Sequence, residues 1–215
     1  MSKKYAEVGH KLHKAANVLS SDSTRDMHFK LISQIQNPAD WLINSQEHKT
    51  KFNEDYDFFS ELNSIEKMMA YDLITYLPTD ILTKVDRAAM AVSLETRVPF
   101  LDPDVIKFSA SLPLEYKIRN GVSKWALREV LFKHVPKDLI ERPKMGFGIP
   151  IGLWIKDELR EWTETQLSEE SFDKHGLLNR SLIYEMWQKH LNGDGNYFSS
   201  LWPVIQFNDW YSKQT

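Results

Sequence analysis

Cysteine is absent from the 215-residue sequence, and so is any long hydrophobic run. Without cysteine, disulfide bonds, thiolate zinc sites and cysteine nucleophiles are excluded within this chain. The basic N-terminal stretch has no apolar core of signal-peptide length, and nowhere do about 18 apolar residues follow one another, as a membrane-spanning helix requires. We therefore expect a cytoplasmic chain with no membrane partner.

The sequence also lacks an excess of charge of either sign. Its 27 lysine and arginine residues nearly balance 30 acidic residues, which gives a net charge of −3 and a pI near 6.2. A protein that binds the phosphate backbone of nucleic acid usually carries a basic excess, so nucleic acid is not expected as a partner. The hydrophobic content of 42% is sufficient for a core, and we expect residues 1–215 to form a portion of one domain.

Helical periodicity dominates the middle of the chain. Apolar residues recur at three-and-four spacing over 65–76 and again over 81–92, and the run 77–79 (Leu-Pro-Thr) predicts a break and restart between them. Residues 98–101 should be extended, because proline disfavours helical geometry in the residue before it. The pair Asp102-Pro103 then predicts a helix cap followed by proline at the first helical position.

Few of the other segments have the alternating pattern of a strand, so the predicted fold is mainly α. Tyr116 to Ile118 is expected to be a short extended segment, and Asn120-Gly121 a turn that leads into a helix capped by Ser123. Further helices are expected over Met27 to Ile35, Glu54 to Leu62 and Pro136 to Ile140, from about Trp154 through Trp162, from Asn179 to about Leu191, and over Tyr197 to Trp210. Asn37-Pro38 is expected to be a connection, and Asn192-Gly193 is expected to end the helix that Asn179 caps.

Two charged clusters are embedded in otherwise apolar sequence: Lys84, Asp86 and Arg87, and then Glu95 and Arg97. One interpretation is structural, because buried charges are costly unless they pair, and such residues then form salt bridges that fix helix crossings. The other interpretation is functional. Arg97 would bind a carboxylate and Glu95 an amine or a proton in a substrate cleft.

A loop is predicted over 141–150, because two prolines and two glycines exclude regular structure from most of it. Within this loop, Gly146 and Gly148 allow the backbone to approach a ligand closely and leave amide groups free. Lys144 is either a solvated surface lysine or a cation placed against a polyphosphate, where it would stabilise charge that develops in a transition state.

No metal site is predicted, since His10, His13 and His28 lack partners at ligand spacing.

Three stretches together carry a family resemblance. They are LPTDILTKVDRAAMAVSLETRVPFLD from Leu77 to Asp102, KWALREVL from Lys124 to Leu131, and ERPKMGFGIPI from Glu141 to Ile151. In this order and spacing the chain resembles the C-terminal part of glutamine-dependent asparagine synthetases, and three ordered matches are far more specific than one motif. The aromatic stretch LWPVIQFNDW from Leu201 to Trp210 is similar in character.

The resemblance implies a chemistry and a fold. In such enzymes ATP adenylates the side-chain carboxylate of aspartate, and ammonia from a glutaminase domain attacks the acyl-adenylate to give asparagine and AMP, with Mg²⁺ neutralising the phosphates. It implies a helical lobe that packs on the parallel sheet of an α/β ATP-pyrophosphatase domain of the adenine nucleotide α-hydrolase type. It also implies a cytoplasmic enzyme, and we consider a homodimer.

Carried over by position, Lys144 matches the lysine that contacts the phosphates during adenylation. Glu95 and Arg97, together with Asp86 and Arg87, match positions near the synthetase cleft, where they either touch substrate or brace it. Asp102 is expected to be a helix cap.

The sequence contains neither the glutaminase nor the Ser-Gly-Gly-x-Asp-Ser phosphate loop of the family. We therefore expect a truncated synthetase portion, inactive alone, with ATP and Mg²⁺ bound mainly by the missing upstream segment. Two alternatives are open: a related amidotransferase for another carboxylate, because one adenylating scaffold serves several acids, and a helical interaction module without catalysis.

Overall fold

The structure is a computed structural model, and most of the residues that it describes lie in helices, which confirms the predicted mainly α fold. The chain forms two compact units, one comprising 1–54 and 148–215 and the other 55–147. We call them the terminal unit and the middle unit. The described residues are 15–16, 18–35, 37–45, 48, 50, 52, 54, 57–142 and 149–214.

Two short helices, α2 and α3, lie among the residues that the structure describes in the N-terminal part of the terminal unit. The first, α2 (Thr24–Ile32), begins after Ser23, whose hydroxyl accepts a hydrogen bond from the Asp26 amide at 3.1 Å. It ends three residues before the predicted boundary at Ile35, and the expected connection at Asn37-Pro38 is instead the start of α3 (Pro38–Trp41). The segment after α3 pairs with the C-terminal region through the Leu42–Leu178 bridge and an Ile43 N–H bond to the Leu177 carbonyl at 2.8 Å.

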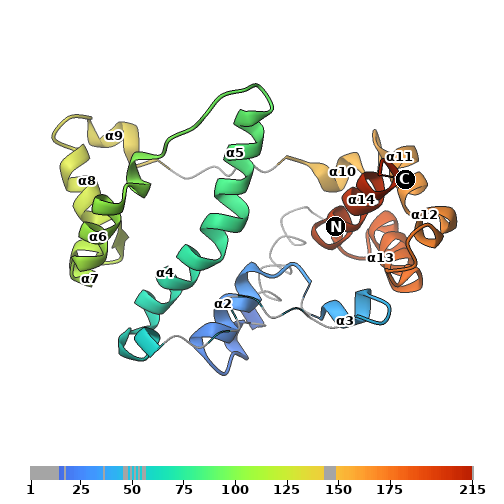
Figure 1. The fold of residues 1–215 in the computed structure, drawn as a ribbon, viewed down its shortest axis with the longest axis horizontal. Helices are drawn as coiled ribbons and strands as arrows, with labels where there is room; N and C mark the ends of the chain where they lie inside the picture. The colour runs from blue at the N-terminus through green and yellow to red at the C-terminus, as the bar shows by residue number, and fades with distance from the viewer. Residues whose placement is uncertain are drawn as a thin grey trace. The chain divides into compact units, whose positions relative to one another are not determined.

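Five helices form the C-terminal part of this unit (Figure 1). The single helix predicted around Trp154 to Trp162 is two helices, because residues 155–159 form turns that direct Ile155 into the core at 0% exposure. The helix predicted from Asn179 to about Leu191 begins and ends as expected: the Asn179 side chain accepts from the Leu182 amide at 3.3 Å, and Gly193, just after the helix, has a φ of 79°. The helices are α10 (Ile151–Trp154), α11 (Arg160–Gln166), α12 (Glu169–Asp173), α13 (Arg180–Asn192) and α14 (Phe198–Ser212).

The terminal unit has a well-defined hydrophobic core. On α14 the buried residues are Leu201, Val204, Ile205 and Asn208, which repeat at the spacing of one helix face. Residues between α10 and α13 pack against this face. Trp41, which is distant in sequence, packs in the same cluster and so joins the N-terminal segment to the C-terminal helices. The other buried hydrophobic members of the cluster are Ile155, Leu167, Phe172, Ile183 and Trp187.

In the middle unit, the predicted break at Leu77-Pro78-Thr79 is wrong: the helix continues through it (Figure 1). Pro78 lacks an N–H and removes one rung of the α-helical ladder, and the backbone widens into a π-helical stretch. Threonine hydroxyls add hydrogen bonds along this stretch, with Thr79 donating to the Thr75 carbonyl at 2.7 Å and Thr83 to the Pro78 carbonyl at 2.9 Å. The long helix consists of α4 (Ser64–Ile74), η3 (Leu77–Leu82) and α5 (Thr83–Met90). Before it, the helix predicted over Glu54 to Leu62 is instead the 3₁₀ helix η2 (Asp57–Glu61).

The rest of the middle unit corrects three local predictions. Pro99 to Leu101 form a 3₁₀ turn, with only Val98 extended, and Tyr116 lies in a helix. Asn120-Gly121 is a hairpin turn with positive φ at both residues, so Ser123 pairs in a strand and caps no helix. The elements are η4 (Pro99–Leu101), α6 (Pro103–Ser111), α7 (Leu114–Lys117), β1 (Ile118–Arg119), β2 (Val122–Ser123), α8 (Trp125–Leu131) and α9 (Lys137–Ile140), the last as predicted.

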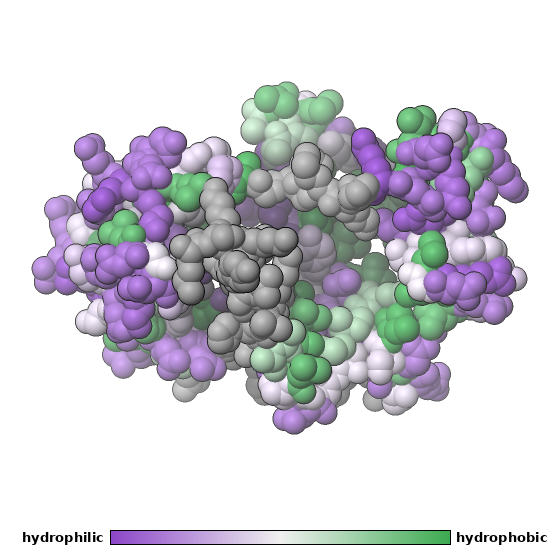
Figure 2. All heavy atoms as spheres, turned by 180° about the vertical axis from the view of Figure 1, so that it is seen from behind, coloured by the Kyte–Doolittle hydropathy of each residue, from purple (hydrophilic) through white to green (hydrophobic). Residues whose placement is uncertain are grey.

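The middle unit buries few hydrophobic side chains. Among its described residues, only Phe59 and Tyr71 are buried hydrophobics, and their ring centroids lie 4.8 Å apart. Val92 is 75% exposed and Phe108 64%, and hydrophobic side chains lie open on the molecular surface among hydrophilic ones (Figure 2). The helices of this unit therefore present apolar faces that its own described residues do not cover.

Candidate functional site

A groove of about 650 Å³ lies in the middle unit, between the C-terminal half of the long helix and the segment that leads into α6. Leu82, Val85 and Asp86 occupy one helix face at spacings of three and four residues, so the continuous helix presents all of them to the groove. The facing wall is formed mainly by the end of the same motif stretch, from Thr96 to Asp102. It is lined by Thr96, Arg97, Val98, Pro99, Leu101, Asp102 and Pro103.

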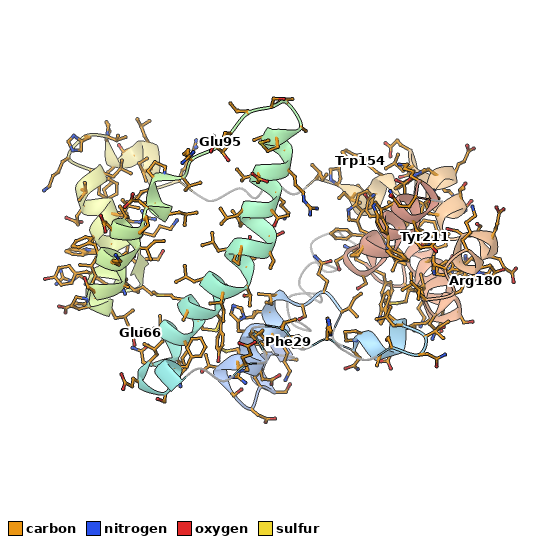
Figure 3. All side chains as sticks on the ribbon, viewed as in Figure 1. Phe29, Glu66, Glu95, Trp154, Arg180 and Tyr211 are labelled. Carbon is orange, nitrogen blue, oxygen red and sulfur yellow. The ribbon has the colours of Figure 1, made fainter. Side chains whose placement is uncertain are left out.

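Arg97 and Glu95 form an ion pair at this groove. The Arg97 Nη2 atom lies 2.6 Å from the Glu95 Oε1 atom, and the side chains remain 86% and 69% exposed, respectively. Figure 3 shows Glu95 on the irregular segment that follows α5. An exposed pair of this kind contributes little to folding, which argues against the interpretation that these charges are internal braces. The guanidinium keeps further N–H donors with which to bind a carboxylate.

The first charged cluster divides between the groove and the solvent. Asp86 lines the groove, whereas Arg87 is exposed on α5 outside the lining. Lys84 lies 2.5 Å from Asp80, and the hydrogen bond from this carboxylate raises the pKa of the lysine above its usual range. The pair is on the helix surface, one turn apart, so it does not fix a helix crossing.

Asp102 is a helix cap, as predicted. Its Oδ1 atom accepts from the Asp104 amide at 2.9 Å and the Val105 amide at 3.4 Å, and Pro103 occupies the first helical position. The cap fixes where α6 begins and therefore where the facing wall of the groove ends.

The predicted loop residues cannot be placed beside this groove. Lys144, Gly146 and Gly148 lie outside the described residues, as does the rest of 143–148. Their predicted roles at a phosphate site stay predictions.

The sequence interpretation missed Thr96 and the apolar wall of the groove. The signal was present, because Leu82 and Val85 share a face with Asp86 in the helix predicted over 81–92, but no local pattern shows that residues 96–103 lie opposite this face. Thr96 stands between the two residues that were singled out, and its hydroxyl adds a neutral hydrogen-bonding group to the lining.

No group of three or more histidine, aspartate or glutamate side chains is arranged to hold a metal ion among the residues that the structure describes. Within the same part of the chain, no helix has the length and apolar character needed to cross a membrane.

Comparison with known proteins identifies the family of the chain. The sequence model of the family described as asparagine synthase matches residues 2–212. The chain belongs to the asparagine synthase family. This match covers nearly the whole sequence and confirms the resemblance carried by the three motifs.

Asparagine synthetases from several organisms are similar to the chain. "Asparagine synthetase [glutamine-hydrolyzing] 1" of Bacillus subtilis (strain 168) is 34% identical over 164 residues, which are 76% of this chain and 25% of the relative. A putative glutamine-hydrolysing asparagine synthetase of Mycobacterium bovis is 38% identical over 149 residues, 69% of this chain and 22% of the relative. The human asparagine synthetase is 28% identical over 179 residues, which are 75% of this chain and 32% of the relative. No solved structure is a significant match.

Proposed function

We propose that this chain is the C-terminal helical part of the synthetase portion of a glutamine-dependent asparagine synthetase. The complete protein would use ATP to activate the side-chain carboxylate of aspartate and ammonia from glutamine to form asparagine. The observation that carries the proposal is the family match over residues 2–212, because it includes all the residues that line the groove. The chain spans only about a quarter of its B. subtilis relative, so the activity is proposed for a longer protein.

The groove suits a small, charged substrate. Arg97 offers a planar set of N–H donors that matches a carboxylate, while Asp86 and Glu95 offer acceptors for an ammonium group. Aspartate carries both groups, separated by a short carbon skeleton that the wall formed by Leu82 and Val85 would contact. Binding through the α-carboxylate and amine would leave the side-chain carboxylate available for adenylation.

The phosphate chemistry is assigned to Lys144 and to segments beyond this chain. The Lys144 ammonium would neutralise charge on the phosphates as the bond to pyrophosphate breaks, and the amides of Gly146 and Gly148 would add hydrogen bonds. Mg²⁺ is proposed to be bound by residues elsewhere in the longer protein, since no cluster of carboxylates or histidines suited to a metal occurs in the described part of this chain.

The exposed apolar faces of the middle unit support the same assignment. Val92, Phe100 and Phe108 are each more than half exposed, a costly arrangement for hydrophobic side chains in water. We assign these faces to packing against the parallel sheet of an ATP-pyrophosphatase domain. The chain alone would self-associate through them, and sedimentation of the purified chain as a monomer at high concentration would argue against that assignment.

Lys144→Met in the complete protein tests the catalytic assignment. Asparagine formation should fall by at least about 100-fold, the scale of losing one electrostatic contact in a transition state, while glutamine hydrolysis is spared. The matched control is Lys133→Met, which removes an exposed lysine from the same unit and should leave both activities unchanged. Equal loss of both activities in Lys144→Met, or loss of neither, would refute the assigned role.

Arg97→Gln tests the substrate assignment. Release of pyrophosphate is measured with aspartate and with other carboxylic acids as the acceptor. The variant should raise the KM for aspartate about 10- to 100-fold, because a charged hydrogen bond to the substrate is lost. Arg160→Gln, which removes an exposed arginine on α11, is the control. In the unsubstituted complete protein, stronger pyrophosphate release with another acid than with aspartate would favour a related amidotransferase. Release with no acid would favour a helical module without catalysis.

A further inference from the structure

His190 stands at the meeting point of three segments in the terminal unit. It lies in the last turn of α13 and is 3% exposed. Its Nε2 atom is 3.0 Å from the carbonyl oxygen of Gly152 in α10, and its Nδ1 atom is 3.3 Å from the backbone nitrogen of Tyr197, the residue before α14. One imidazole therefore connects the end of one helix with the body of a second and the start of a third.

The two partners determine the protonation state of the ring. The Tyr197 nitrogen is a donor, so Nδ1 must accept and carries no proton; the Gly152 oxygen is an acceptor, so Nε2 carries the proton and donates it. Both bonds can form only with the neutral imidazole in this tautomer. A second proton, added at Nδ1, would place two donors face to face.

We propose that His190, Gly152 and Tyr197 form a proton-sensitive clamp, closed at neutral pH and released when His190 is protonated. Release would break the hydrogen bond to Tyr197 and so free the segment between α13 and α14. It would also weaken the attachment of α10 through Gly152. In the sequence, α10 closely follows the loop that contains Lys144. The proposal concerns the terminal unit alone and does not rest on the proposed function.

The surroundings of the clamp favour the neutral ring. Burial lowers the pKa of His190 below its ordinary value of 6.5, and the nearby Lys156 ammonium lowers it too, while the carbonyls of Gly152 and Gly195 oppose the shift. Lys189, the residue before His190 on α13, forms an ion pair with Glu185 at 2.6 Å and also interacts with Asp194. Trp187 covers the ring from its own helix, with ring centroids 6.1 Å apart.

A cavity beside the ring provides space for opening. It measures about 310 Å³ and is lined by His190 and Lys156 together with Gly152, Gly195, Phe198 and neighbouring residues. Close packing leaves little room for side chains at the glycines: a Cβ on Gly195 would lie 2.6 Å from the Tyr197 ring, and one on Gly152 would lie 3.2 Å from Phe198. The backbone therefore holds both partners near the imidazole while the cavity gives water a route to the opened ring.

The direction of the pH effect follows from the lowered pKa. The closed clamp binds fewer protons than the open one, so its stability is fully present above about pH 6.5 and is lost as the pH falls from there toward the pKa of the closed state. An open imidazole of ordinary pKa is about 90% protonated at pH 5.5, which shifts the opening equilibrium by up to about tenfold relative to pH 7.5.

Amide hydrogen exchange of the whole chain, followed by NMR and corrected for intrinsic rates, tests the clamp. The protection factor of the Tyr197 amide should fall between pH 7.5 and pH 5.5, by up to about tenfold. The Leu182 amide is a matched control, because it is bound at the same 3.3 Å to the side chain of Asn179, which does not titrate in this range, and its protection should change less than twofold.

A variant separates the clamp from general loss of structure. In His190→Gln the side-chain amide keeps a donor and an acceptor but does not titrate in this range, so Tyr197 protection should be independent of pH. His134→Gln, an exposed histidine of the middle unit, should behave as wild type. If the variant does not fold, the wild-type experiment alone decides. Unchanged Tyr197 protection at pH 5.5, or a fall matched by Leu182, would overturn the proposal.

Discussion

Leu201→Ala should strongly destabilise the terminal unit. Leu201 has 0% exposure and lies on the buried face of α14, within the cluster that includes Ile183 and Trp187. Truncation removes the buried methyl groups and leaves a cavity that rigid neighbours fill only in part, which costs about 3 kcal/mol, within a usual range of about 2 to 5. With a urea m-value of about 1.5 kcal/mol per M, the unfolding midpoint should fall by about 2 M.

Tryptophan fluorescence provides the assay. Of the seven tryptophans, Trp125 lies in the middle unit and the others in the terminal unit, so a Trp125→Phe background makes the signal specific for the terminal unit. Leu177→Ala is the matched control: this leucine is 47% exposed, and its truncation should cost less than about 1 kcal/mol. A loss below about 1 kcal/mol for Leu201→Ala, or equal losses for both variants, would contradict the described core.

Three further outcomes are expected. Asn208→Leu should cost about 2 kcal/mol in urea unfolding, because it leaves the Gln166 carbonyl without the 2.7 Å bond from the Asn208 side chain; no loss would mean that this carbonyl has another donor. Asn63→Ala should cost about 1 kcal/mol by removing the capping box of α4, measured by circular dichroism on thermal unfolding. The hydrogen bond from Lys213 lowers the pKa of Asp209, so its stabilising effect is present above the ordinary pKa of 3.8 and is lost as the pH falls further; Lys213→Met should move the NMR titration of this carboxyl upward.

Local rules predicted elements whose causes lie within a few residues. Asp102 and Asn179 cap helices because a short side chain with an oxygen acceptor reaches the free amides of the first turn. Gly193 ends a helix because it adopts positive φ without a steric penalty. These predictions succeed wherever the decisive contacts are close in sequence.

The same rules failed at two places. The break predicted at Pro78 did not occur, because the backbone widens into a π-helical stretch that keeps the helix continuous past the missing N–H of proline. The helix predicted through Trp154 and Trp162 divides, because the turn between them allows Ile155 to be buried. Propensity gives no indication of either outcome.

For the candidate site, the sequence by itself identified Asp86, Glu95 and Arg97 as charges of interest and supplied the family through three ordered motifs. Tertiary structure decided that Asp86 and Arg97 share a groove, that Arg87 does not line it, and that His190 connects three helices. Chemical type and local periodicity are properties of neighbouring residues and can be read along the chain. Which groups face one another depends on how distant segments pack, and many competing packings satisfy the same local preferences.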